Sequence, residues 1–268
     1  MSQAVAQSVQ QMHKISYLSA MKKATQALLQ RLLGFERYLF FFARFKIATL
    51  RWDSQRQEGD FNHFLRLLGP HFHVLDIGAN IGIMTVLMAR RCRAGRVYAF
   101  EPVPDNCHTL GQVVTHYRLA HVEIHPVALG PGPGEVAMAM PVIGGVRMQG
   151  LSHVVHQSID GYDAPAASYR VQQVALDDWP FEKGTKIHAI KMDVENYEQY
   201  VLEGAMQLIA RDKPLIYCEL WDNANRRRCF ELLEGAGYEV RVRVKGLLVP
   251  FEAPKHSHHN FFFLPKKP

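Results

Sequence analysis

The sequence predicts an α/β protein built on a mostly parallel sheet, and three observations indicate this fold class. The stretch His73–Gly82 is a short apolar strand that runs into a Gly-x-x-x-Gly turn, and residues 83–90 continue with helical periodicity. A second apolar strand that ends in an acid follows at residues 96–101. From Phe61 onward, strand and helix patterns alternate, which indicates helices on both faces of the sheet.

Each element is expected from its apolar pattern and from the turn residues that bound it. The expected strands are residues 73–77, 96–101, 121–125, 135–140, 169–175, 186–193, 214–220, 238–244 and 260–264. The expected helices are residues 82–92, 104–117, 197–210 and 226–234. The two strands at 135–140 and 169–175 form a β insertion before the fourth core strand. Its loop, residues 144–168, either shapes a pocket or is a plain surface loop.

The N-terminal segment, residues 1–60, is expected to be helical and separate in character from the domain at 61–268. Apolar residues recur there at helical spacing, at Met12, Ile15, Leu18, Met21, Leu28, Leu29, Leu32 and Leu33. Gly34 is a candidate helix end, and the aromatic stretch Phe35–Trp52 is a second helix. The apolar faces cover the core domain or a second subunit in a homodimer; alternatively, residues 35–52 lie on a membrane surface or wall the substrate entrance.

Composition describes an ordinary globular protein with a mild positive charge. The chain has 268 residues, with 31 Lys and Arg against 25 Asp and Glu, for a net charge of +6. This balance permits an anionic partner without requiring one. Leu39–Leu50 is too short to span a bilayer and contains Arg44 and Lys46. Four scattered cysteines and the absence of a signal peptide pattern lead us to expect a cytoplasmic protein without a transmembrane segment.

The loop after the first strand has the features of a site for a nucleotide-like cofactor. Gly78 and Gly82 suit a sharp turn that brings the backbone close to a ligand. In a βαβ unit, an acid at the end of the second strand, here Glu101, reaches the hydroxyls of a ribose. Asp76 would repel a pyrophosphate and attract an ammonium group. A cofactor with a ribose, a cationic amino-acid end and no phosphate fits this pattern, which indicates S-adenosylmethionine.

A longer series of motifs resembles a known family. The series comprises Val-Leu-Asp-Ile-Gly-Ala-Asn-Ile-Gly82, Val-Tyr-Ala-Phe-Glu-Pro102, Pro-Val-Ala-Leu-Gly130, Ala-Leu-Asp-Asp178, Ile-Lys-Met-Asp-Val-Glu195 and Pro-Leu-Ile-Tyr-Cys-Glu219. In order and spacing it is similar to the FkbM family of S-adenosylmethionine-dependent methyltransferases. The resemblance implies a Rossmann-like class I methyltransferase sheet of seven strands with an antiparallel last strand. It also implies an acceptor hydroxyl on a natural product, a sugar or a lipid-linked glycan.

One position departs from the family pattern. The family tends to have Asp-x-Glu-Gly-x-Glu, whereas this chain has Asn196 in place of the glycine. Asn tolerates left-handed or helix-capping geometry, so we expect the backbone to be retained.

Cofactor roles follow from the order of the strands. We expect the methionine end to contact Asp76 and the loop residues Gly78, Ala79, Asn80 and Gly82, and the ribose to contact Glu101. Val127, Ala128 and Leu129, after the third strand, are expected at the adenine. The alternatives are that Asp76 caps a turn, that Glu101 faces solvent, and that residues 127–129 only pack in the core.

Catalysis of methyl transfer to an alcohol needs alignment and removal of a proton. Asp193 and Glu195, at the end of the fourth strand, are the expected catalytic carboxylates, and Asp193 also contacts the cofactor. A base at Glu195 should be partly desolvated; the alternative is that these acids cap the next helix. His259 is a third candidate, because an antiparallel last strand begins on the ligand edge. Its alternative is a solvated loop.

Two further hypotheses remain open. Asp193 with Asp222 and Asn223 is a candidate magnesium site, as a weaker alternative to direct contact with the cofactor or acceptor. The run Arg226–Arg228 suggests an RNA or other nucleic-acid substrate, although the sequence lacks the Pro-Pro-aromatic clamp and the cysteine nucleophile of base methylation. The sequence therefore predicts an O-methyltransferase that acts on a small-molecule, saccharide or lipid-linked acceptor and releases S-adenosylhomocysteine. A cofactor-binding protein without catalytic activity is the other alternative.

Overall fold

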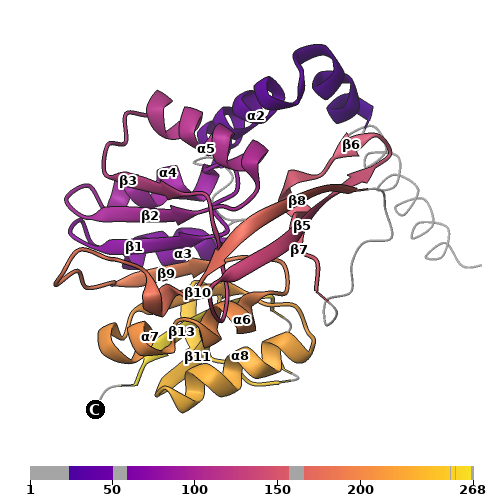
Figure 1. Ribbon diagram of the computed structural model, residues 1–268. Coiled ribbons are helices and arrows are strands. Elements are labelled where there is room, and N and C mark those ends of the chain that lie inside the picture. Colours follow the sequence, from indigo (N-terminus) through magenta and orange to yellow (C-terminus); the bar gives the residue numbers. More distant parts are fainter. Residues whose placement is uncertain (1–23, 51–58, 157–165, 254, 257, 267–268) are drawn as a thin grey trace, which may run out of the picture.

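The computed structural model describes residues 24–50, 59–156, 166–253, 255–256 and 258–266. Its centre is an eight-stranded sheet in the order β12-β11-β13-β10-β9-β1-β2-β3 (Figure 1). The strands are β1 (His73–Ile77), β2 (Arg96–Phe100), β3 (Val122–His125), β9 (Ala189–Met192), β10 (Leu215–Glu219), β11 (Tyr238–Val244), β12 (Leu247–Pro250) and β13 (Asn260–Pro265).

The directions of the strands confirm a mostly parallel sheet with an antiparallel last strand. β1 pairs in parallel with β2 and β9, β2 with β3, and β9 with β10. β13 lies antiparallel between β10 and β11. The sheet has one strand more than the seven we expected, because the chain turns back after β11 to form β12. Lys245 and Gly246 both have positive φ, 50° and 88°, as a two-residue hairpin turn requires.

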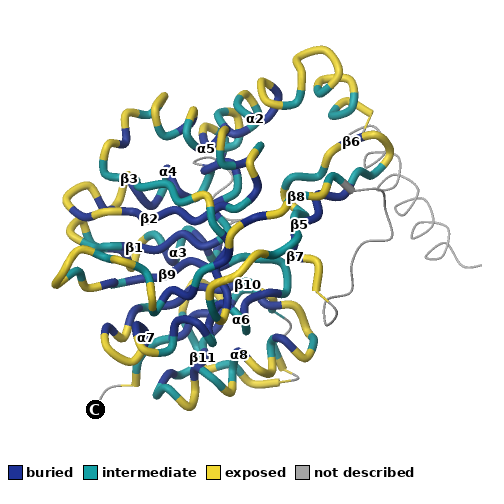
Figure 2. Tube along the Cα trace, viewed as in Figure 1, coloured by how far each residue is buried: buried dark blue, intermediate teal, exposed yellow. Residues whose placement is uncertain are grey.

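The sheet is buried on both faces, and its central strands are apolar apart from a few side chains such as the buried Asp76 and Lys191. Val74 and Leu75, adjacent in β1, belong to two different hydrophobic clusters, one on each face. Side chains of α2 (Phe35–Leu50), α3 (Gly59–Leu67), α4 (Ile83–Arg91) and α5 (Pro104–His116) complete the first cluster, and those of α6 (Glu198–Glu203), α7 (Met206–Asp212) and α8 (Ala224–Gly235) complete the second. Figure 2 shows the buried strands between helices whose outer sides are exposed.

The residues between β3 and β9 form a separate sheet, which confirms the β insertion. Its strands are β4 (Ala128–Leu129), β5 (Gly134–Ile143), β6 (Val146–Arg147), β7 (His153–Val154) and β8 (Ala166–Val174). β5 and β8 pair along almost their whole length and project from the core as a long hairpin toward the N-terminal helices (Figure 1). Part of the predicted loop, residues 157–165, lies outside the described residues.

The described part of the N-terminal segment is helical, as expected. Residues 24–33 form a helix, Gly34 interrupts it with a φ of 77°, and α2 follows. The buried side of α2 packs against α4 and α5, so this helix covers the core domain. The predicted stripe at 12–21 and the end of the aromatic stretch lie outside the described residues. Among the helices that the structure describes, none combines the length and apolarity needed to cross a membrane.

The helix predicted at 197–210 is wrong in one respect, because two helices, α6 and α7, occupy this stretch. Gly204 lies between them, and a Cβ added to it would stand 2.0 Å from the backbone oxygen of Gly130. The break therefore allows the chain after β4 to pass directly against this turn.

Candidate active site

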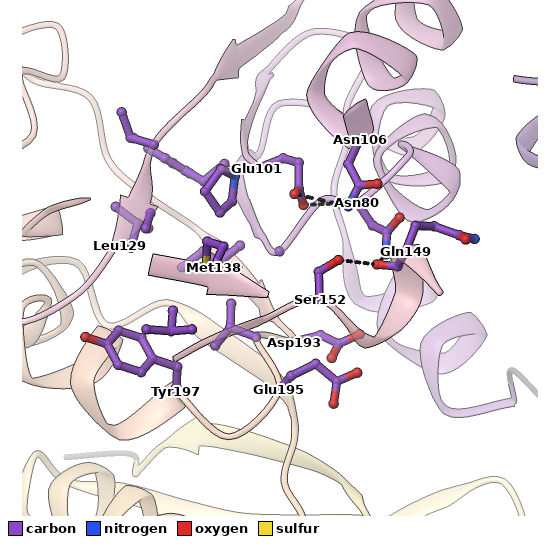
Figure 3. Close-up of a pocket in the computed structure, with 18 of the residues that line it drawn as sticks. Asn80, Glu101, Asn106, Leu129, Met138, Gln149, Ser152, Asp193, Glu195 and Tyr197 are labelled. Atoms are coloured by element: carbon purple, nitrogen blue, oxygen red, sulfur yellow. Dashed lines mark hydrogen bonds between the residues drawn. The ribbon is translucent and has the colours of Figure 1, made fainter. Parts of the chain in front are cut away.

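The carboxyl ends of β1, β2 and β9 meet at one cavity (Figure 3). Its volume, including the open mouth, is about 610 Å³. The strand ends contribute Ile77, Gly78, Phe100, Glu101, Asp193, Val194 and Glu195. The rest of the wall comes from Asn80, Pro102, Asn106, Val127, Ala128, Leu129, Met138, Gln149, Gly150, Ser152, Val154 and Tyr197. Chain segments far apart in the sequence therefore converge where open α/β sheets bind ligands.

Glu101 is buried in the wall of this cavity and is held by three donors. The backbone N–H of Asn80 donates to its Oε2 at 2.8 Å, and the N–H of Val103 and the Nδ2 of Asn106 donate to its Oε1 at 3.0 and 3.3 Å. Burial raises the pKa of this carboxyl to about 7, although the three hydrogen bonds and Lys191 oppose the rise. A carboxylate has about four acceptor positions, so one remains for a ligand hydroxyl.

The apolar end of the cavity lies around residues 127–129. Ala128 and Leu129 are buried in the main hydrophobic cluster and also line the cavity, together with Val127. Phe100 and Met138 complete this apolar wall. The two interpretations of residues 127–129 are therefore compatible, because the same side chains pack in the core and form a flat apolar surface for an aromatic ring.

The glycine loop brings the ends of β1 and β9 together. Gly78 has a φ of 75°, and a Cβ added to it would stand 1.9 Å from the backbone oxygen of Asp193. Asn80 also has a positive φ, of 51°, and its side chain accepts a hydrogen bond from the N–H of Ile81. Its Nδ2 donates to the backbone oxygen of Gln149 at 3.3 Å, which links the loop to the β insertion.

Ala79 and Gly82 belong to the same loop but do not line this cavity. Ala79 lines a second cavity on the other side of the loop. Gly82 lines neither cavity; a Cβ added there would stand 2.6 Å from Leu110, in α5. The contact expected between Gly82 and the cofactor stays a prediction, which the position of Gly82 outside both cavities does not favour. Its role is to let α4 begin close against α5.

Asp76 is also placed differently from the expectation. Its side chain is fully buried and lines neither cavity, because it alternates with Ile77 along β1. The Oγ1 of Thr85 donates to its Oδ2 at 2.6 Å, and the Nζ of Lys191, paired opposite it in β9, lies 3.3 Å from its Oδ1. The direct contact expected between Asp76 and the methionine end stays a prediction, which the full burial of this side chain does not favour.

Lys191 connects this buried acid to the site. It is 3% exposed, and its Nζ donates to the backbone oxygen of Gly78 at 2.8 Å. Burial lowers the pKa of Lys191, but Asp76 and Asp193 outweigh this effect and the net pKa lies above its ordinary value. The ammonium group therefore stays charged beneath the glycine loop and fixes its backbone.

Asp193 and Glu195 follow β9 and face the cavity together (Figure 3). Glu195 has a φ of 53°, a conformation that is uncommon for a residue with a Cβ. Burial, together with repulsion from Asp193, Glu219 and Glu198, raises the pKa of the Glu195 carboxyl to about 8. The predicted desolvation of Glu195 agrees with this environment, and the raised pKa suits a general base near neutral pH.

The two residues that complete this motif have structural roles. Asn196 has a φ of 71°, and its Oδ1 accepts a hydrogen bond from the Nδ2 of Asn223 at 2.6 Å. Glu198 is buried away from the cavity and accepts hydrogen bonds from the N–H of Val194 and the Nδ2 of Asn225. The loop after β9 is thereby tied to the start of α8, and asparagine supplies the left-handed backbone that glycine supplies in the family pattern.

Three other candidates are not brought into the site. His259 is exposed, lies against the ring of Trp221 at 4.9 Å and lines neither cavity, so we do not retain it as a base. Asp222 forms an ion pair with Arg226, and Asn223 caps α8 by accepting from the N–H of Arg226. Within the part of the chain that the structure describes, no three His, Cys, Asp or Glu side chains are grouped as metal ligands.

The sequence did not reveal the residues that the insertion contributes. Met138 and the segment around the short helix η1 (Gln149–Leu151), with Ser152 and Val154, cover the cavity opposite the strand ends. The loop was recognised as a candidate pocket wall, but its side chains have no periodic or motif signal. Asn106 was detectable in principle, since it lies in the first turn of the helix that follows Glu101.

The comparisons with known proteins agree with this geometry. The family model of the FkbM methyltransferase domain matches residues 76–260. The match begins at Asp76 and contains all the strand ends of the cavity, but it leaves out the N-terminal helices. A search of curated proteins found none that matches this chain.

Similar solved structures include an FkbM methyltransferase from Methylobacillus flagellatus, with 17% identity and a TM-score of 0.49 over 73% of this chain and 44% of that one. This chain thus spans less than half the length of that protein. An S-adenosylmethionine-dependent O-methyltransferase from Thermotoga maritima has 12% identity and a TM-score of 0.47, over 83% of this chain and 72% of that one. A putative rRNA methylase from Clostridium thermocellum has 11% identity and a TM-score of 0.43, over 76% of this chain and 90% of that one. Because the family model matches more than half of its length, this chain belongs to the FkbM methyltransferase family.

Proposed function

We propose that this chain transfers a methyl group from S-adenosylmethionine to a hydroxyl oxygen. The observation that carries the proposal is the buried carboxyl of Glu101, which faces the same cavity as Asp193 and Glu195. Glu101 suits a sugar, the apolar wall beside it suits a nucleobase, and the two acids at the neighbouring strand end suit a cationic centre.

The residues of the cavity fit this cofactor. Glu101 retains an acceptor position for a ribose hydroxyl, and the apolar wall around Leu129 and Met138 suits the adenine. Gly78, Asn80 and Asp193 surround the region left for the methionine end. A ligand ammonium or sulfonium group near Asp193 would receive electrostatic stabilisation from the carboxylates. The fit does not depend on a metal ion.

The chain's own contribution to the reaction is to orient the acceptor and to receive its proton. When bound, the cofactor would supply a methyl group attached to a positively charged sulfur. The neutral thioether that remains after transfer is a good leaving group. In our proposal the carboxylate of Glu195 accepts the proton of the acceptor hydroxyl while the acceptor oxygen bonds to the methyl carbon and the bond between that carbon and sulfur breaks. Asp193 binds the hydroxyl or the cofactor ammonium. A base with a pKa of about 8 is much better matched to this task than an ordinary carboxylate.

A direct test is the affinity for S-adenosylhomocysteine, measured by titration calorimetry. Glu101→Ala removes a charged acceptor of hydrogen bonds, worth about 1.5–3 kcal/mol, so the affinity should fall by roughly 10- to 150-fold. Glu123→Ala is the matched control, because Glu123 is a partly exposed acid in β3 that pairs with Arg96. An unchanged affinity in folded Glu101→Ala would contradict the ribose assignment.

The acceptor classes proposed from the sequence are a small molecule, a saccharide or a lipid-linked compound. The nucleic-acid alternative gains little support from Arg226–Arg228. Arg226 is paired with Asp222, and Arg228 lies within ion-pair distance of Glu203 and Glu231. A binding protein without catalytic activity would bind S-adenosylhomocysteine equally well, so release of this product from S-adenosylmethionine with an acceptor present separates the two.

A further inference from the structure

A second cavity adjoins the first and shares part of its wall. Its volume is about 1110 Å³ with its open mouth. Five residues line both cavities: Gly78, Asn80, Gln149, Gly150 and Asp193. Asp193 therefore stands on the boundary, so a group held in one cavity can meet a group held in the other beside this carboxylate.

The wall of the second cavity is mostly apolar and comes from three separate segments. Each segment contributes three apolar side chains. They are Tyr38, Phe42 and Leu50 from α2; Ile81, Ile83 and Met84 from the loop before α4 and its first turn; and Val146, Met148 and Leu151 from the β insertion. Tyr38 and Phe42 stack with ring centres 5.8 Å apart. A ligand that occupies this space must present an extended apolar surface.

Two hydrogen bonds hold the backbone of Arg147, which lines the cavity. The Nε2 of Gln30 donates to the backbone oxygen of Arg147 at 3.2 Å, and the N–H of Arg147 donates to the Oε1 of Gln30 at 3.1 Å. They join the first N-terminal helix to β6. α2 and this helix lie outside the residues matched by the family model, so this wall is not part of the family domain.

The charges on the wall are unevenly compensated. Three cations line the second cavity, namely Lys46, Arg147 and Lys191, against one acid, Asp193. Lys191 is offset by Asp76, and Arg147 lies 3.5 Å from Asp105. Within the described residues, Lys46 forms no ion pair. It follows Phe42 by one helical turn, on the same side of α2, so an anionic group there would be attracted to its ammonium.

We propose that the second cavity is the acceptor site and takes an amphiphile: an alcohol with an apolar body and an acidic group at the end away from Asp193. The inference rests on the proposed function, since it assigns the hydroxyl end to the boundary with the first cavity. The apolar body lies between α2 and the insertion, and the acidic group pairs with Lys46. A soluble amphiphile and a membrane lipid share this chemistry.

The test uses two fluorescent probes that differ in one charge, in the presence of S-adenosylhomocysteine. 1-Anilinonaphthalene-8-sulfonate carries a sulfonate, and N-phenyl-1-naphthylamine has the same rings without it. Phe42→Ser should lower the affinity for both probes by roughly tenfold, as expected for the loss of a buried aromatic contact of about 1.5 kcal/mol. Lys46→Gln should weaken the binding of the sulfonate probe only. Phe41→Ser, on the exposed side of α2, is the matched control and should leave both unchanged.

The outcomes separate the inference from the function on which it rests. If S-adenosylhomocysteine binds every variant but probe affinity falls with Phe41→Ser and not with Phe42→Ser, the acceptor assignment is overturned and the proposed function stands. If the wild type does not bind S-adenosylhomocysteine, the proposed function itself fails.

A competition experiment then asks for the source of the amphiphile. 12-Hydroxydodecanoate, which has the hydroxyl, the chain and the acid, should displace the sulfonate probe; failure to do so contradicts the proposal. Sedimentation with phosphatidylglycerol vesicles distinguishes the sources: binding that is lost in Phe45→Ser, a residue 63% exposed on α2, indicates a membrane lipid. Displacement without sedimentation indicates a soluble compound.

Discussion

The two sides of the site are built in different ways. The floor consists of the ends of β1, β2 and β9, where backbone pairing and buried charges fix each residue. The cover consists of α2 and the segment from Val146 to Val154, which is held by the short pairings of β6 and β7 with β5 and by hydrogen bonds at Arg147 and Gln149. The comparison teaches that, in the proposed function, the cofactor is bound mainly by the floor, whereas the acceptor is selected mainly by the cover.

Removal of the buried ammonium of Lys191 should have the largest effect. Lys191→Met keeps the volume but leaves Asp76 buried beside an apolar side chain, and loss of one partner of a buried ion pair costs about 3–5 kcal/mol. Urea unfolding measures the change. Asp76→Asn combined with Lys191→Met should recover part of the loss. Lys255→Met, which removes an exposed pair with Glu252, should change stability by under about 1 kcal/mol.

A pair of glycines tests the contrast between floor and cover directly. Gly78→Ala places a Cβ against the backbone of Asp193 and at a positive φ, so we expect destabilisation by about 2–4 kcal/mol. Gly150, in the cover, has no atom within 4 Å of an added Cβ. Gly150→Ala should change the unfolding free energy by less than about 0.5 kcal/mol. Equal losses in the two variants would show that the cover is as constrained as the floor.

Binding of S-adenosylhomocysteine should depend on pH through Glu101, whose pKa is about 7. The ionised carboxylate accepts ribose hydroxyl donors better than the protonated acid does. The affinity is therefore fully present well above this pKa and is lost as the pH falls through it, by roughly tenfold between pH 8 and pH 6. Calorimetry at pH 6 and pH 8 measures the ratio. In Glu101→Gln the ratio of the affinities at pH 8 and pH 6 should approach one. Any pH dependence that remains then belongs to other groups such as Glu195.

Much of the floor could be predicted from the sequence, because its signals are local. The apolar runs gave the strands, and the spacing from Gly78 to Glu101 gave the cavity wall. Asp76 lies outside the cavity because its side chain alternates with Ile77 along β1, and it pairs with Lys191 of the neighbouring strand instead. His259 was misplaced because strand order gives the edge of the sheet, not the direction in which a side chain points.

The cover could not be predicted in the same way. Gln149 and Ser152 reach the cavity because the chain returns from β6 along β5, where β7 pairs with it, a long-range arrangement without a sequence period. The same holds for Phe42, whose helical stripe predicted a buried face but not the neighbour it would meet.

The smallest effect concerns Asn196, where this chain differs from its family. Its φ of 71° suits glycine, but its Oδ1 also accepts a hydrogen bond from Asn223. Asn196→Gly relieves the strain and loses this bond, so the two changes oppose each other and the unfolding free energy should shift by under about 1 kcal/mol. Asn196→Ala loses the bond and keeps the strain, at a cost of about 1–2 kcal/mol. If alanine proves as stable as glycine, the left-handed backbone is not what selects the residue here, and the contact with α8 must be. Thermal unfolding of the two variants beside Asn223→Ala, which removes the same bond from the other partner, decides between these explanations.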